Sequence, residues 1–167
     1  MNLPVPFYNF INVLSVGVIF LLGLVVIDSD VLFLLIRSCE FYLFKYFPEV
    51  VFVLVLLCLL YEVGYVINRI GSVLLENILI KVHFIKFVDS YGKYNKAKKE
   101  YPIMEILSRE YAASRTRVVL FGILFAYSLC MGNTFCSFIL FFAIGFYLCS
   151  LKKHSSKIVE LILISQE

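Results

Sequence analysis

Four long apolar runs, separated by shorter polar segments, dominate the pattern of the chain. They cover residues 10–27, 50–67, 118–131 and 135–151, and the first reaches spanning length when Phe7 and Tyr8 are added. A helix needs about 20 apolar residues to cross a bilayer, with about 17 as the lower limit. The pattern therefore predicts an all-α integral membrane protein with four transmembrane helices. The third run is short, so we expect either local thinning of the bilayer or inclusion of Arg115 to Arg117 by snorkelling.

The segments before and after the first run indicate a retained anchor followed by an interfacial stretch. No Lys or Arg precedes the run, and no small-x-small cleavage site follows residues 25–27, so we expect a membrane anchor and not a cleaved signal peptide. Asp28 and Asp30 follow the end of this first run. Residues 31–48 mix aromatic side chains with Arg37, Glu40 and Lys45, which suits a headgroup environment on the outer face.

Residues 71–117 are predicted to form a cytoplasmic helical insertion between the second and third spans. Residues 71–88 either extend the second helix or lie on the membrane, and residues 91–100, the most polar stretch, are expected to form an exposed loop or hinge. Pro102 can start a helix over 103–117 that continues into the third span.

The end of the chain forms a hairpin and a tail in this prediction. Gly132, Asn133 and Thr134 favour a tight outer turn, and residues 155–167 are too short to span. The tail is either an amphipathic helix packed on the inner segment or a strand that contacts a partner. The predicted divisions are 1–70, 71–117, 118–151 and 152–167.

Positive charge is concentrated in two places, and this predicts the orientation. Ten of the 15 Lys and Arg residues lie within 69–117 and three within 152–157. Loops rich in Lys and Arg stay in the cytoplasm, so the rule predicts a multi-pass protein of the inner (cytoplasmic) membrane with both termini cytoplasmic. The composition is 62% hydrophobic with a mean hydropathy of +0.94. In such a chain the net charge of +3 indicates topology, and we expect no direct binding of nucleic acid.

Glu62 is the one carboxylate inside a predicted span, about 7 Å from its inner boundary. A charge at that depth is costly and suggests a function. Arg69 is two turns away on the same face, and Arg115 or Arg117 of the adjacent helix could reach it more easily. These four residues form a hypothetical charge switch. The alternatives are a structural ion pair and, in an oligomer, a ring of Glu62 carboxylates that selects cations.

Two further surfaces follow from spacing. Gly122, Ala126 and Cys130 recur at four-residue intervals, as do Gly145 and Cys149, and such small faces let membrane helices pack closely, within the hairpin or between subunits. Glu105, Arg109 and Glu110 form either a solvated face or a surface for a cytoplasmic protein partner.

Motifs for catalysis or for a metal are absent from the sequence. His83 and His154 are far apart and lack nearby Cys or carboxylate residues at ligand spacing, and the five cysteines contain no C-x-x-C. Of the five cysteines, only Cys39 is expected on the outer face, where formation of an intermolecular disulfide is an open alternative. No hydrolase, metalloprotease or phosphate-loop motif occurs. We therefore expect no enzymatic activity, no metal and no cofactor.

One stretch resembles known proteins. Residues 68–72 (Asn-Arg-Ile-Gly-Ser), Glu76, and the series 105–111 followed by Arg115 are similar to a family of small bacterial four-span proteins. In outline they also resemble the membrane subunits of anti-phage systems, Kiwa among them. The resemblance implies an oligomer that senses or executes a membrane response together with a cytoplasmic partner.

Three functional hypotheses follow. The first is an oligomeric inner-membrane sensor or effector in a defence or stress response that gates or perturbs the bilayer. The second is a non-conducting scaffold that recruits a soluble partner through residues 71–117 and the tail. The third, a lipid-modifying enzyme, lacks a convergent acid–base or metal set.

Overall fold

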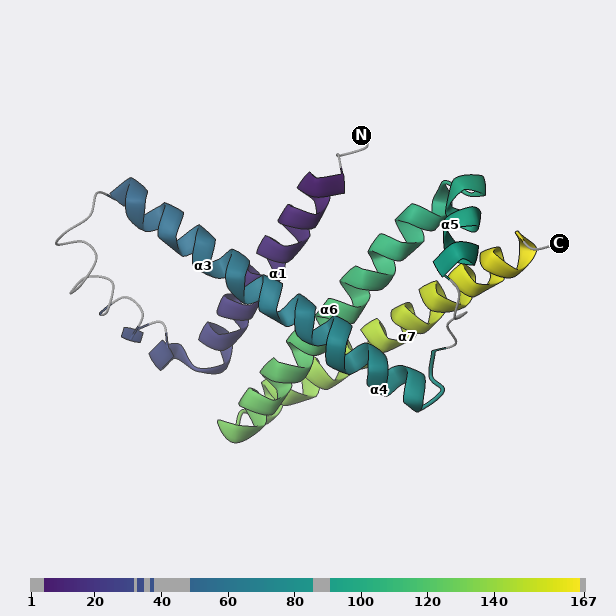
Figure 1. The fold of residues 1–167 in the computed structure, drawn as a ribbon. Coiled ribbons are helices and arrows are strands. Elements are labelled where there is room, and N and C mark those ends of the chain that lie inside the picture. Colours follow the sequence, from purple (N-terminus) through teal and green to yellow (C-terminus); the bar gives the residue numbers. More distant parts are fainter. Residues whose placement is uncertain (1–4, 32, 35–36, 38–48, 86–90, 166–167) are drawn as a thin grey trace.

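The computed structural model describes residues 5–31, 33, 34, 37, 49–85 and 91–165, and within these ranges every regular element is a helix (Figure 1). The helices are α1 (Val5–Ile27), α3 (Glu49–Ile70), the π-helical turn η1 (Gly71–Leu75), α4 (Glu76–Lys81), α5 (Tyr91–Glu100), α6 (Ile103–Cys130) and α7 (Thr134–Ile164). Four of the helical stretches are long and apolar enough to cross a membrane: Phe7–Ile27, Val53–Lys81, Ile103–Cys130 and Thr134–Ile164. The chain thus has the helices of a multi-pass membrane protein, as its hydropathy pattern predicts.

Helices α6 and α7 form a long antiparallel hairpin (Figure 1). Gly132 adopts a φ of +70°, which glycine accommodates without steric cost, and Asn133 caps α7 by accepting a hydrogen bond from the Cys136 amide at 3.1 Å. Beneath the turn, the buried hydroxyls of Ser128 and Ser137 lie 2.9 Å apart and bond to each other. The predicted turn at 132–134 is confirmed. The helix predicted from residue 103 runs without a break into the third apolar run, because α6 is one helix from Ile103 to Cys130, and the treatment of Arg115 to Arg117 at the bilayer stays a prediction.

Helices α1 and α3 cross in direct backbone contact at two glycines. A Cβ atom added to Gly17 would lie 1.9 Å from the Leu60 carbonyl oxygen, and one added to Gly64 would lie 2.0 Å from the Val13 carbonyl oxygen. Any side chain at either position would force the helices apart, so the two glycines set the crossing. Around it, Val16, Ile67, Leu120 and Leu124 form a buried apolar core that joins α1 and α3 to α6.

The second membrane helix does not end where its apolar run ends. It continues through η1 into α4, so residues 71–81 extend the second helix, which was one of the two predicted arrangements. His83, with a φ of +58°, follows the end of α4. Residues 86–88 of that segment, and Cys39 with most of the expected interfacial stretch 31–48, lie outside the described residues.

At the end of the hairpin opposite the α6–α7 turn, α5 packs against the start of α6 and the end of α7 around a second core (Figure 1). Its buried side chains include Ala97, Met104, Leu107, Leu151, Ile158 and Ile162. Residues 155–164 of the tail are helical: they form the last part of α7 and pack on residues of the 71–117 segment, as one of the two alternatives predicted. The predicted divisions at 117 and 151 fall inside the continuous helices α6 and α7.

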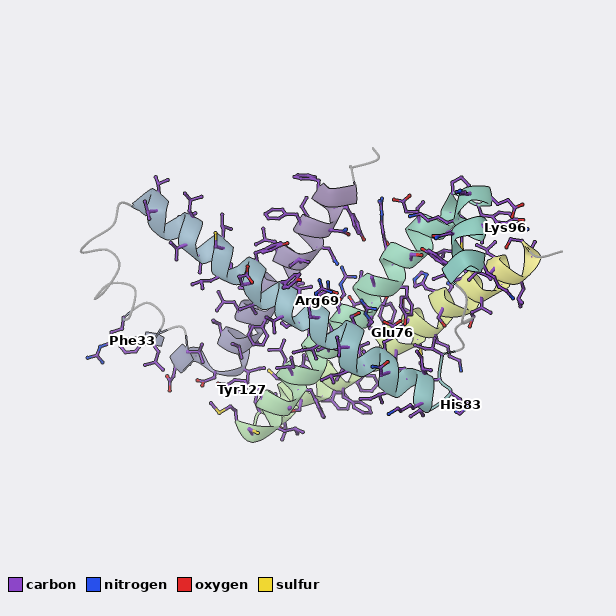
Figure 2. All side chains as sticks on the ribbon, in the orientation of Figure 1. Phe33, Arg69, Glu76, His83, Lys96 and Tyr127 are labelled. Atoms are coloured by element: carbon purple, nitrogen blue, oxygen red, sulfur yellow. The ribbon has the colours of Figure 1, made fainter. Side chains whose placement is uncertain are left out.

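Residues 91–100 form a helix, so the expectation of an exposed loop or hinge there is wrong. Ala97 is fully buried, the Tyr94 hydroxyl lies 2.7 Å from Ser108 Oγ, and Lys96 Nζ donates to the Ser165 carbonyl oxygen at 2.7 Å (Figure 2). These contacts hold α5 on both long helices. The lysines Lys98 and Lys99 lie on its exposed side.

The small residues of the hairpin do not pack within the chain. A Cβ added to Gly122 or Gly145 would meet no atom within 4 Å, and the side chains of Ala126, Cys130 and Cys149 are exposed. The prediction that α6 packs on α7 through these residues is therefore wrong. Of the two alternatives, a contact with a neighbouring subunit stays a prediction.

Candidate functional site

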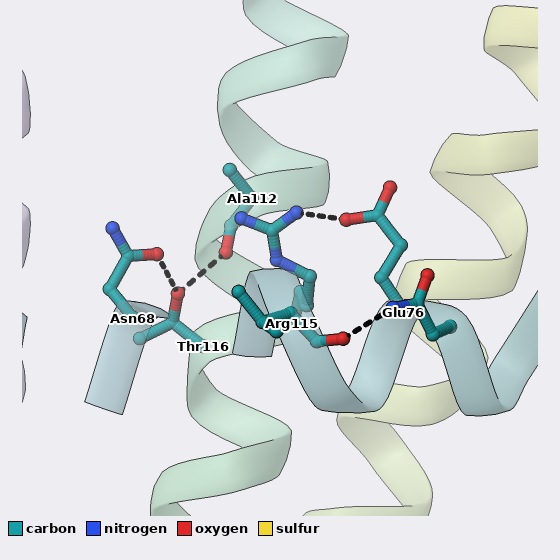
Figure 3. A network of polar contacts seen from close by, with 7 residues as sticks. Asn68, Glu76, Ala112, Arg115 and Thr116 are labelled. Carbon is teal, nitrogen blue, oxygen red and sulfur yellow. Dashed lines mark hydrogen bonds and ion pairs between the residues drawn. The ribbon is translucent and has the colours of Figure 1, made fainter. Parts of the chain in front are cut away.

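The polar centre of the molecule lies where η1 and the start of α4 pass α6. Arg115 of α6 forms an ion pair with Glu76, the first residue of α4 (Figure 3). The two side chains are only 13% and 23% exposed, so solvent screens their attraction weakly. This ion pair joins the extended second helix to α6, whose first residues belong to the second core.

The Arg115 side chain lies beside the π turn. The defining bond of this turn runs from the Glu76 backbone amide to the Gly71 carbonyl oxygen, five residues earlier (Figure 3). Gly71 is buried, and a Cβ there would lie 3.5 Å from Arg115 Cγ, within ordinary contact distance. The side chain of Arg115 therefore lies directly against the wider turn and reaches Glu76 from it.

About two turns before Glu76 on the second helix, and next to Arg115 on α6, an amide and a hydroxyl join the same two helices. The Thr116 hydroxyl donates to Asn68 Oδ1 at 2.8 Å and shares its proton with the Ala112 carbonyl oxygen at 2.9 Å (Figure 3). Thr116 is 1% exposed. A buried hydrogen bond of this kind fixes the register of α3 on α6.

A polar pocket of about 380 Å³ opens beside this junction, between α1, α3 and α6. In Figure 1 the N-terminal halves of α1 and α6 lie on the same side of α3. The lining residues are Tyr8, Asn9, Phe10, Asn12 and Val13 from α1, Tyr61, Tyr65 and Asn68 from α3, and Arg109, Ala112 and Arg115 from α6. Two arginines, three amides and three phenols thus face one space, which contains no carboxylate among its lining residues.

Arg69 and Arg117 of the predicted charge switch contact aromatic rings. Arg69 donates from Nε and Nη2 to the Tyr65 hydroxyl oxygen at 2.9 and 2.7 Å, and Figure 2 places it on the same continuous helix as Glu76. The Arg117 guanidinium carbon lies 5.5 Å from the centre of the Tyr147 ring, a cation–π distance.

Glu62 is exposed, and within the described part of the chain it makes no hydrogen bond or ion pair. Arg115 was expected to face Glu62, and that pairing is wrong because its carboxylate partner is Glu76. The four residues predicted as one switch therefore separate into a buried junction at Arg115 and an unpaired carboxylate on an outer face of α3.

The predicted partner surface is also divided. Arg109 pairs with Glu105 one turn earlier, its guanidinium carbon lies 5.3 Å from the centre of the Tyr8 ring, and it lines the pocket. Glu110 is exposed. Only Glu110, with the partly exposed Glu105, remains on the outer surface.

In the described part of the chain, neither histidine belongs to a cluster of metal-ligating side chains. Among the described residues no group of three His, Cys, Asp or Glu side chains lies close enough to hold a metal ion. His83 is exposed, and His154 is partly buried on α7.

Several residues of the site were missed from the sequence. The sequence prediction contains Glu76 only as one of the charged residues of 71–117 and as part of the resembling stretch, although it is the first carboxylate after the second apolar run, and that spacing was an available signal. Tyr8, Asn9 and Asn12 were considered only as part of an apolar run, but three polar side chains within five residues at one end of a span indicate a polar neighbour.

Comparison of the chain with family models, with curated proteins and with solved structures gives no match. The resemblance to small four-span proteins and to anti-phage membrane subunits therefore stays a prediction.

Proposed function

We propose that the protein is an oligomeric sensor or effector of the bacterial inner membrane, with both termini cytoplasmic, in which Glu62 lies at the contact between copies. The observation that carries the proposal is an unpaired carboxylate on an exposed, apolar face of a membrane-length helix. One turn on either side of Glu62, Leu59 is 58% exposed and Val66 is 53% exposed. The same face of α3 thus presents a charge among hydrophobic residues.

Lipid is an unfavourable environment for an ionised Glu62 on that face. An ionised side chain near the middle of a membrane helix costs about 2.5–3.5 kcal/mol on insertion scales, and such residues normally face a protein interior or a water-filled path. Among the described residues of one copy, none covers Glu62. A second copy placed on this face would remove the carboxylate from lipid, and a ring of copies would place several carboxylates around one axis, where they favour cations.

The junction at Glu76 supports a route from the second core to this face. Glu62 and Glu76 belong to one continuous helix, and Arg115 belongs to the helix that enters the second core. A signal that moves α6 would move Glu76 through the ion pair and shift α3 as a whole. Such a shift would open the cation path between copies or perturb the bilayer. The biological setting that we propose is a membrane-linked defence or stress response, based on the resemblance alone.

The test is membrane potential in cells that express the protein. We expect wild-type protein to depolarise the membrane when triggered or overproduced, and Glu62→Gln to reduce this at least tenfold, because the amide removes the charge and keeps the shape. Glu160→Gln, an exposed site on the inner part of α7, is the matched control and should behave as wild type. Depolarisation that is equal in both variants, or absent from wild type, would contradict the proposal.

A scaffold is the second candidate, and a specific surface favours it. At the start of α6, Ile103 is 54% exposed and Ile106 is 58% exposed, and both share one helix face with the exposed Glu110. Exposed isoleucines beside a charge suit a cytoplasmic protein partner. In full-length protein, Ile106→Asp should abolish co-purification of such a partner without changing membrane potential. The outcome that supports a pure scaffold is this loss together with a silent Glu62→Gln.

A further inference from the structure

The pocket between α1, α3 and α6 has the chemistry of an anion site, and we propose that it binds a phosphate group. Among the described residues that line it, the only ionised groups are the guanidiniums of Arg109 and Arg115. Each gives one Nη nitrogen to a carboxylate, Glu105 for Arg109 and Glu76 for Arg115. A guanidinium has five N–H donors, so most donors of both remain for a ligand.

Both arginines also carry an unsatisfied polar atom. The Nε atoms of Arg109 and Arg115 are buried and have no hydrogen-bond partner among the described residues. A buried N–H without an acceptor costs about 1–3 kcal/mol, and more when it belongs to a charged group. Phosphate oxygens match the planar fork of a guanidinium, so a phosphate in the pocket would bring acceptors beside two arginines whose Nε atoms have none.

The remaining lining residues suit the same ligand. The Tyr65 hydroxyl oxygen accepts two N–H groups from Arg69, which leaves its own proton to donate. Asn9 and Asn12 bring amide donors from α1, and Phe10 stacks on Tyr61 with ring centres 5.2 Å apart, forming an apolar wall. A space of about 380 Å³ is much larger than a simple ion needs and fits a phosphate with an organic substituent.

The ligand has two possible sources, a lipid headgroup and a soluble phosphate compound. Arginine, asparagine and tyrosine at one end of apolar helices are typical of the headgroup region, which favours the lipid. That the ligand is also the signal rests on the proposed function, whereas its binding does not. Failure of binding would leave the Glu62 proposal intact, and a silent Glu62→Gln would leave the binding result intact.

The experiment uses full-length protein purified in detergent with phosphatidylglycerol, and native mass spectrometry counts the lipids that each copy retains. A parallel arm follows the melting temperature with inorganic phosphate and with glycerol 3-phosphate. The test variants are Arg109→Gln and Asn12→Leu, which leave the Glu76–Arg115 pair in place. Arg117→Gln is the matched control, because it removes the same charge from the same helix outside the pocket.

We expect wild type and Arg117→Gln to retain phosphatidylglycerol and Arg109→Gln to bind it about tenfold more weakly or worse, the loss that corresponds to one charge-assisted hydrogen bond. Asn12→Leu should weaken binding in the same direction. A soluble source is indicated if only the phosphate compounds raise the melting temperature, again in wild type and Arg117→Gln alone. Absence of both effects from wild type, or equal loss in Arg117→Gln and Arg109→Gln, would overturn the proposal.

Discussion

At the scale of single residues, two ion pairs of the same charge type differ in what surrounds them. Glu76–Arg115 joins two helices and is mostly buried, whereas Glu105–Arg109 is an i,i+4 pair on one helix whose side chains are 37% and 24% exposed. Because the second pair is partly exposed and lies on one helix, its contribution to the free energy of unfolding is about a few tenths of a kcal/mol. The sequence predicted an important arginine at 115 but assigned it the wrong carboxylate. The π turn and the continuation of α3 decide which acid faces it, and neither is visible in the spacing of charges.

Removing one member of the buried pair should therefore be costly. We expect Glu76→Gln or Arg115→Gln to lower the free energy of unfolding by about 2–4 kcal/mol, because the remaining charge stays buried without its partner. The double variant should cost less than the sum of the two single variants. Glu105→Gln, as the comparison, should cost about 0.5 kcal/mol or less. Reversible unfolding in mixed micelles measures all four, and additive losses at 76 and 115 would refute the coupling.

At the scale of elements, hydropathy sufficed to predict the four membrane-length helices, and the Gly-Asn-Thr sequence sufficed to predict the turn between α6 and α7. It failed at α5, where one buried alanine and two side-chain contacts hold a lysine-rich segment in a helix. It also missed the crossing of α1 and α3, since nothing local in either helix reveals which glycine meets a neighbouring backbone. The repeated small residues on α6 and α7 were the more conspicuous pattern, yet they face outward.

These two groups of glycines should respond differently to one added methyl group. Gly17→Ala and Gly64→Ala place a Cβ within 2.0 Å of a carbonyl oxygen of the neighbouring helix, so we expect each to cost about 1–3 kcal/mol as the crossing is forced open. Gly122→Ala and Gly145→Ala meet open space and should be neutral or stabilising by up to about 1 kcal/mol within one copy. Melting temperatures in detergent test this, and equal shifts in both groups would argue against the crossing.

At the scale of the whole molecule, the described part of a single copy leaves many apolar side chains of α3 exposed. The exposed face around Glu62 and the outward small residues of the hairpin lie on different helices, whereas α5, α6 and α7 already enclose the second core. Charge and hydropathy were enough to predict a membrane protein. They could not indicate which faces remain uncovered, because that depends on how the helices pack on one another.

The most direct test of the account is chemical cross-linking at residue 62 in native membranes. The five native cysteines are replaced by alanine, including Cys58, which lies one turn before Glu62, and a single cysteine is placed at 62 or at 63. Val63 is the control, since it packs against the chain's own core. With a short bis-maleimide reagent, Glu62→Cys should give covalent dimers in high yield and Val63→Cys should give almost none. Monomers alone at position 62, or equal yields at both positions, would contradict the claim that copies of the protein meet at Glu62.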